Sequence, residues 1–156
     1  LNANYPANCM SNNDNYAKYL TNVGEAIQNK IDAFGDSVLV HGDLWEGNIV
    51  ENPLTGAIDV IDYDRCHLNL QEWDLAYYVI NRYIRKEKIT ANIMFSENVN
   101  LTVRDLFGFV VELFENMSLP IHPERISLCI NSILWLKYRE FVITAGEAPE
   151  IRLNLD

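Results

Sequence analysis

The chain has 156 residues, of which 49% are hydrophobic and 22% are charged, and its formal net charge is −10. This composition fits one globular domain with enough apolar residues for a core, and it argues against a disordered chain. The acidic balance argues against nucleic-acid binding, which needs a basic face, and is compatible with a cationic small-molecule partner. No apolar run approaches a membrane span, and the three cysteines show neither disulfide nor zinc spacing. We therefore expect a cytoplasmic protein with no membrane partner.

Residues 12–35 are predicted to form a helix. Apolar side chains recur there at steps of three and four, which is the period of one helix face. These side chains are Tyr16, Leu20, Val23, Ile27, Ile31 and Phe34. Gly35 ends the pattern, as glycine commonly does after a helix, and the chain then enters a short apolar strand.

Residues 37–64 are predicted to form a tight loop followed by a β-hairpin. The apolar strand at 38–40 brings His41, Gly42 and Asp43 to a strand end. Gly42 permits the sharp turn that the backbone needs at this point.

The hairpin carries two further polar side chains. Asn48 precedes its first strand, residues 52–56 form the turn, and residues 57–61 run back as the second strand. Asp62 ends that returning strand. We therefore expect Asp43, Asn48 and Asp62 to converge on one edge of the hairpin.

These oxygen-bearing side chains match the needs of phosphoryl transfer. A carboxylate positions the attacking hydroxyl and accepts its proton, while an amide and a second carboxylate hold Mg²⁺ against the nucleotide phosphates. Asp43 takes the first role, and Asn48 and Asp62 take the second. Asp59 alternates to the strand face opposite Asp62 and is expected to be solvated, whereas Asp64 is a candidate contact for a second metal or the substrate.

Three segments of the chain resemble one enzyme superfamily. HGDLWEGN (41–48), VIDYD (60–64) and WDLA (73–76) are similar to the catalytic loop, metal-binding strand end and following helix of the aminoglycoside phosphotransferase and choline kinase superfamily. The resemblance covers residues 38–79 and rests on the order and separation of all three segments. It implies a protein-kinase-like fold, of which this chain would be the carboxy-terminal lobe.

The resemblance also implies a role for each matching residue. Asp43 is the catalytic base, His41 braces the catalytic loop, and Asp74 anchors that loop from a helix. Asn48 and Asp62 bind Mg²⁺ and the nucleotide, either ATP or GTP. Gly42 supports the loop and stands where typical protein kinases carry arginine, and a Tyr-Asp pair replaces their Phe-Gly.

The amino-terminal lobe of such a kinase is not represented in the sequence. The seven glycines form no G-x-G-x-x-G pattern, and the residues before position 38 are too few for a complete lobe. We expect a longer enzyme whose isolated carboxy-terminal lobe has little or no activity.

Residues 71–146 are predicted to form a helical subdomain on the substrate side. Helical periods run from 71 to 85, follow Thr102, and extend from Pro123 toward Gly146. Trp135 and Tyr138 on the last helix are candidates for stacking on a cationic ligand, but aromatic residues at this spacing more often belong to the core. The predicted fold class is thus α+β, mostly helical, with one small catalytic hairpin.

The leading hypothesis is a small-molecule kinase. Its acceptor would be a hydroxyl of an aminoglycoside, a choline-like amine, a ketosamine or a related metabolite. The alternative is a non-catalytic protein that keeps the kinase-like fold for a structural role, such as a spore-coat relative. Retention of Asp43, Asn48 and Asp62 together favours the enzyme. A two-metal phosphoesterase is disfavoured because the chain lacks Asp-x-His and His-x-His ligand patterns.

Overall fold

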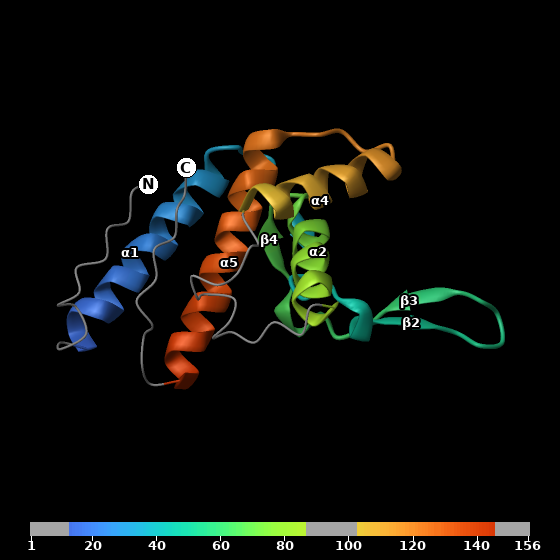
Figure 1. Ribbon diagram of the computed structural model, residues 1–156, viewed down its shortest axis with the longest axis horizontal. Helices are drawn as coiled ribbons and strands as arrows, with labels where there is room; N and C mark the ends of the chain where they lie inside the picture. The colour runs from blue at the N-terminus through green and yellow to red at the C-terminus, as the bar shows by residue number, and fades with distance from the viewer. Residues whose placement is uncertain (1–12, 87–102, 146–156) are drawn as a thin grey trace.

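The structure is a computed structural model that describes residues 13–86 and 103–145. The described chain is mostly helical. Its long helices are α1 (Asn13–Asp32), α2 (Trp73–Lys86), α4 (Val103–Asn116) and α5 (Pro123–Ala145). Figure 1 shows α1 and α5 side by side, α2 next to α5, and α4 crossing over the end of α2.

The described strands form two small antiparallel sheets. β1 (Val38–Val40) pairs with β4 (His67–Asn69), and β2 (Ile49–Glu51) pairs with β3 (Ile58–Val60). The β2–β3 hairpin projects away from the helices (Figure 1), and both of its strands are largely exposed. The α+β class with a mostly helical content is therefore confirmed.

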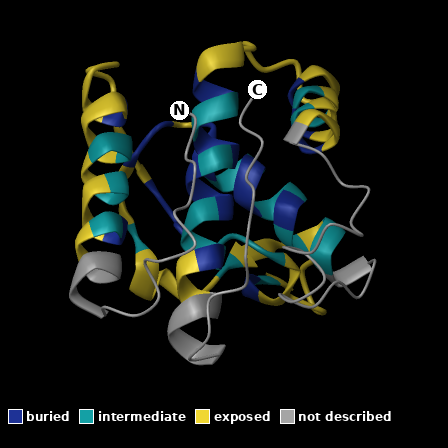
Figure 2. Ribbon diagram, turned by 60° about the vertical axis from the view of Figure 1, so that its left-hand side comes forward, coloured by how far each residue is buried: buried dark blue, intermediate teal, exposed yellow. Residues whose placement is uncertain are grey.

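The core lies where α2, α4 and α5 meet. Fully buried apolar side chains come from all three helices: Ile80 from α2, Val110 from α4, and Ile126, Ile130 and Ile133 from α5. Figure 2 shows that the buried residues lie on the helix sides that face one another. Burying one such side chain is worth about 1.5 to 3 kcal/mol, so these contacts fix the helices on which the candidate site is built.

A buried ion pair joins the beginnings of two helices. Arg125 at the start of α5 donates from Nε to Oε2 of the fully buried Glu72 at 3.0 Å, and from Nη1 to Asp36 before β1. Burial alone would lower the pKa of Arg125, but its bonds to Asp36 and Glu72 raise the pKa above its ordinary value. Burial and the charge of Glu72 also raise the pKa of the Cys129 thiol, so this cysteine is not a reactive nucleophile.

The observed helices agree closely with the predicted segments. The helix expected over 12–35 ends at Asp32, and Gly35 follows with a φ of +72°. The structure adds β4, which no alternating pattern in the sequence had indicated. The helix start expected at Thr102 lies outside the described residues.

The two aromatic residues of α5 belong to the packing. Tyr138 is buried in the core, and the indole ring of Trp135 packs against Gly24 of α1. A Cβ at Gly24 would meet this ring at 3.2 Å, so the small residue allows α1 to approach α5 closely.

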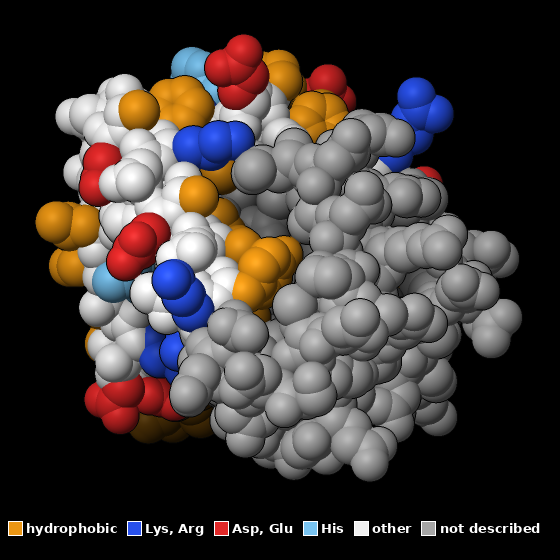
Figure 3. Space-filling view, turned by 90° about the vertical axis from the view of Figure 1, so that its left-hand side faces the viewer, with side chains coloured by type: hydrophobic (Ala, Val, Ile, Leu, Met, Phe, Trp, Pro, Cys, Tyr) orange, Lys and Arg blue, Asp and Glu red, His pale blue; other side chains and the backbone are white. Residues whose placement is uncertain are grey.

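The described surface has a mixed character. Figure 3 shows acidic, basic and hydrophobic side chains interspersed over the described part of one face. No helix within 13–86 or 103–145 is long and apolar enough to cross a membrane.

Candidate active site

The site begins at a turn that only glycine can make. Gly42 follows β1 with a φ of +80°, in the left-handed region that favours glycine. A Cβ at this position would overlap the backbone carbonyl oxygen of Arg65 and approach Nδ1 of His67 at 2.9 Å. The loop after β1 therefore lies directly against the segment that leads into β4.

Asp74 holds this turn from the first turn of α2. Its Oδ2 accepts a hydrogen bond from the backbone amide of His41 at 2.8 Å, and its Oδ1 accepts one from the amide of Gly42 at 2.9 Å. One carboxylate thus satisfies two consecutive amides of the loop. Bonds to a charged acceptor are among the stronger ones in proteins, so the loop position is tied to the helical core.

His41 connects the loop with the end of the hairpin. Its Nδ1 lies 3.3 Å from the amide of Asp43, and its Nε2 lies 2.9 Å from the carbonyl oxygen of Ile61. An amide can only donate and a carbonyl can only accept, so Nε2 carries the proton. The buried ring also contacts Tyr63, with ring centroids 4.8 Å apart. These bonds tie the loop to the end of the hairpin.

Asn48 is buried beside the same loop. Its side-chain Nδ2 donates to the carbonyl oxygen of Asp43 at 3.0 Å, and its own carbonyl accepts from the amide of Ile61 at 2.9 Å. The first bond fixes the orientation of the side-chain amide. Within the described residues, the side-chain hydrogen bond of Asn48 is made by Nδ2 and not by Oδ1.

Asp62 follows Ile61 in a strained backbone conformation. Its φ of 66° and ψ of 65° lie in the left-handed region, which few non-glycine residues adopt. The residue is exposed, and within the described residues its carboxylate accepts no hydrogen bond. Such strain in a non-glycine residue clusters at functional sites.

One prediction about the hairpin needs correction. β3 ends at Val60, so strand alternation does not extend to Asp62 and does not set the direction of its side chain. Asp59 is exposed, as predicted, and pairs with Val50 across the hairpin, while Asp64 lies exposed in the short 3₁₀ helix Tyr63–Arg65.

Asp43 has a partner that the sequence analysis missed. Tyr77 on α2 lies near enough to Asp43 for this carboxylate to act on the tyrosine hydroxyl. Burial, followed by the interaction with Asp43, raises the pKa of Tyr77 to about 12. The signal in the sequence was the position of Tyr77, three residues and nearly one helical turn after Asp74, which places both side chains on the face of α2 toward the loop.

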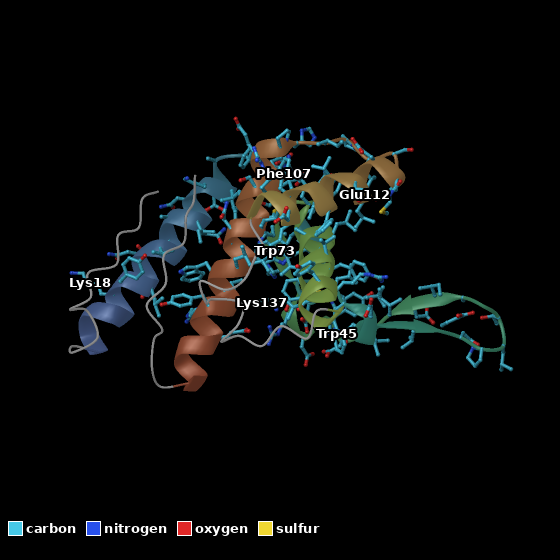
Figure 4. All side chains as sticks on the ribbon, in the orientation of Figure 1. Lys18, Trp45, Trp73, Phe107, Glu112 and Lys137 are labelled. Atoms are coloured by element: carbon cyan, nitrogen blue, oxygen red, sulfur yellow. The ribbon has the colours of Figure 1, made fainter. Side chains whose placement is uncertain are left out.

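Two cationic side chains lie near Asp43 and Tyr77. Nζ of Lys137, which lies on α5 (Figure 4), is 4.9 Å from the ring centroid of Tyr77. Nη1 of Arg65 lies 3.4 Å from Oε1 of Glu140 on α5. The α5 helix therefore contributes side chains that contact Tyr77 and Arg65.

The donor set determines which metal the site could hold. No group of three or more His, Cys, Asp or Glu side chains in the described part of the chain is arranged as a metal site. An amide and a carboxylate oxygen are nevertheless hard ligands, and Mg²⁺ commonly takes only one or two protein ligands besides phosphates and water. Asn48 and Asp62 are connected through Ile61 and fit such a partial set.

Comparisons of the chain with protein-family models, curated proteins and solved structures give no match.

Proposed function

We propose that the chain is the catalytic carboxy-terminal lobe of a small-molecule kinase with a protein-kinase-like fold. It transfers the terminal phosphate of ATP or GTP to a hydroxyl group of a small molecule. The supporting observation is the hydrogen-bonded path that runs from Asp43 through His41 to Ile61 and back through Asn48 to Asp43. This path connects the segment that carries Asp43 with Asn48 and with Ile61, the residue before Asp62.

Each residue then has a defined task. The carboxylate of Asp43 accepts a hydrogen bond from the acceptor hydroxyl and takes its proton as the oxygen attacks the terminal phosphorus. The bond between that phosphorus and the leaving nucleoside diphosphate breaks in the same displacement. Asn48 and Asp62 present oxygens to Mg²⁺, which when bound neutralises charge on the phosphates. His41 and Asp74 keep the loop in place during the reaction.

The strained residue Asp62 favours catalysis over a purely structural role. A left-handed non-glycine residue is destabilising by roughly 1 to 3 kcal/mol, and such residues cluster at functional sites. The acceptor classes proposed from the sequence are aminoglycosides, choline-like amines and ketosamines.

Paramagnetic NMR tests the proposal even if nucleotide binding is weak. Mn²⁺ with ATP or GTP is added to the ¹⁵N-labelled chain. We expect selective broadening of the Asn48 side-chain amide and the Asp62 backbone amide when metal and nucleotide are both present. Asp62→Asn, which tolerates the same backbone conformation, should remove the broadening, and Asp59→Asn should retain it. No selective broadening with either nucleotide, or equal broadening in Asp62→Asn, would refute the proposal.

A further inference from the structure

The α2 helix contacts the catalytic loop at a second place besides Asp74. Asp74, Tyr78 and Arg82 recur at steps of four, so their side chains share one face of α2. Asp74 binds two backbone amides at the beginning of the loop. Arg82 lies about 12 Å farther along the helix axis and donates from Nη1 to Oε1 of Glu46 at 2.8 Å. The same helix therefore contacts the loop near both of its ends.

Glu46 lies in the turn that carries Asn48. It begins the short 3₁₀ helix Glu46–Asn48, and Asn48 ends it. Two backbone hydrogen bonds close this turn, from the amide of Asn48 to the carbonyl oxygen of Trp45 and from the amide of Ile49 to that of Glu46. Gly47 lies between them, and a Cβ at this position would overlap the indole ring of Trp45. The turn is tightly packed, so a contact that holds Glu46 also acts on Asn48.

The guanidinium of Arg82 is also held by a residue of its own helix. Nη1 donates to the hydroxyl oxygen of Tyr78, one helical turn earlier, at 3.0 Å. The side chains of Arg82 and Glu46 are 61% and 48% exposed, and exposed ion pairs contribute little to overall stability. The bond to Tyr78 restricts the arginine in advance, so less freedom is lost in binding Glu46. The contact is thus suited to fixing local geometry.

We propose that Arg82 is a positioning residue for the phosphoryl transfer: it holds the carboxylate of Glu46 and thereby fixes the turn that presents the Asn48 side chain to Mg²⁺. This inference rests on the proposed function. It gives the catalytic loop two anchors on one helix, with Asp74 before the base Asp43 and Arg82 at the turn of Asn48. Arg82 acts through Glu46 and is not itself a metal ligand.

Backbone hydrogen exchange in the metal-free chain tests the contact. Arg82→Met keeps a long apolar side chain but removes the guanidinium. We expect the amides of Asn48 and Ile49 to exchange about two- to five-fold faster in this variant, which is the size of effect expected for an exposed ion pair. Arg104→Met removes an exposed arginine from α4 and should leave both amides unchanged.

A second variant shows whether Arg82 acts through its partner. Glu46→Ala should accelerate the same amides by a similar factor, and the double variant should show no further increase, because both substitutions break one contact. The difference from the unmodified chain should also shrink at about 1 M NaCl, which screens exposed charges. Unchanged exchange in Arg82→Met, additive effects in the double variant, or equal acceleration at His41 and Gly42 would overturn the proposal.

Ligand binding is measured separately from the contact. In a titration with Mn²⁺ and nucleotide, the midpoint for broadening of the Asn48 side-chain amide should rise about two- to five-fold in Arg82→Met, and it should not change in Arg104→Met. The urea midpoints of these two variants should lie close together. An unchanged titration midpoint, or a clearly lower urea midpoint in Arg82→Met, would show that the positioning role is wrong. If the unmodified chain shows no broadening, the proposed function fails and the role in phosphoryl transfer with it, whereas the exchange rates still decide whether Arg82 fixes the turn.

Discussion

Substitution of Asp74 should lower the free energy of unfolding, and the size of the change follows from the hydrogen bonds that Asp74 makes to the loop. The carboxylate accepts bonds of 2.8 Å and 2.9 Å from two backbone amides. A hydrogen bond to a charged group contributes about 1.5 to 3 kcal/mol. Asp74→Ala removes both, so the free energy of unfolding should fall by about 3 to 6 kcal/mol. Asp74→Asn keeps one acceptor oxygen and turns a donor toward the other amide, so it should lower the free energy by about 2 to 3 kcal/mol.

Urea denaturation followed by circular dichroism measures these losses. Asp59→Asn serves as the control, because it makes the same chemical change at an exposed position and should cost less than about 0.5 kcal/mol. Hydrogen exchange should show faster exchange at His41 and Gly42 in Asp74→Asn than in the control. Equal stability of Asp74→Asn and Asp59→Asn, with unchanged protection of the two amides, would refute the anchoring role.

Three further substitutions test the framework of the site. Gly42→Ala combines a positive φ with an overlap against a backbone carbonyl, so it should lower the free energy of unfolding by more than about 3 kcal/mol. Gly56 has a similar φ but lies in open space, so Gly56→Ala should lower it by only about 1 to 2 kcal/mol in the same denaturation assay. Glu72→Gln breaks the buried pair with Arg125, so it should lower the melting temperature and reduce the free energy of unfolding by about 3 to 5 kcal/mol. A smaller reduction than that caused by substituting an exposed acidic residue would contradict the pairing. The raised pKa of Tyr77 contributes stability that is fully present below pH 10 and is lost as the pH rises to about 12. Over this range the free energy of unfolding should fall by roughly 2 to 3 kcal/mol. Urea denaturation at each pH should show a smaller fall in Tyr77→Phe.

The sequence predicted those parts of the fold that depend on local patterns. Helical periodicity located α1, α2 and α5, and the turn residues at 52–56 located the hairpin. β4 was missed because its three residues are too few for alternation to be visible, and it exists through pairing with β1. The ion pair between Glu72 and Arg125 was also hidden, since it joins residues that are adjacent only after α2 and α5 have packed.

The candidate site was predicted in the same partial way. Spacing placed Asp43, Asn48 and Asp62 near one another, and the backbone bonds connect all three segments. Spacing could not show that Asp62 leaves the strand, because a left-handed aspartate has no distinct sequence pattern. The proximity of Tyr77 to Asp43 had no signal of its own in the sequence apart from the spacing to Asp74, because only the tertiary structure brings this part of α2 next to the loop.

The strain at Asp62 leads to a last prediction, in which stability and ligand binding change in opposite directions. Glycine adopts the left-handed conformation without strain but loses more entropy on folding, by roughly 0.5 to 1 kcal/mol. Asp62→Gly should therefore equal or exceed the stability of the unmodified chain, and it should be about 1 to 2 kcal/mol more stable than Asp62→Ala, which keeps the strain.

A second strained position provides the control. Ser118, after α4, has a φ of 55°, so Ser118→Gly should relieve comparable strain while the Mn²⁺-dependent broadening at Asn48 is retained. Asp62→Gly should abolish that broadening. If Asp62→Gly proved less stable than Asp62→Ala, the backbone at this position would not be strained. The aspartate could then be retained for stability alone, and the argument that its conformation serves ligand binding would lose its basis.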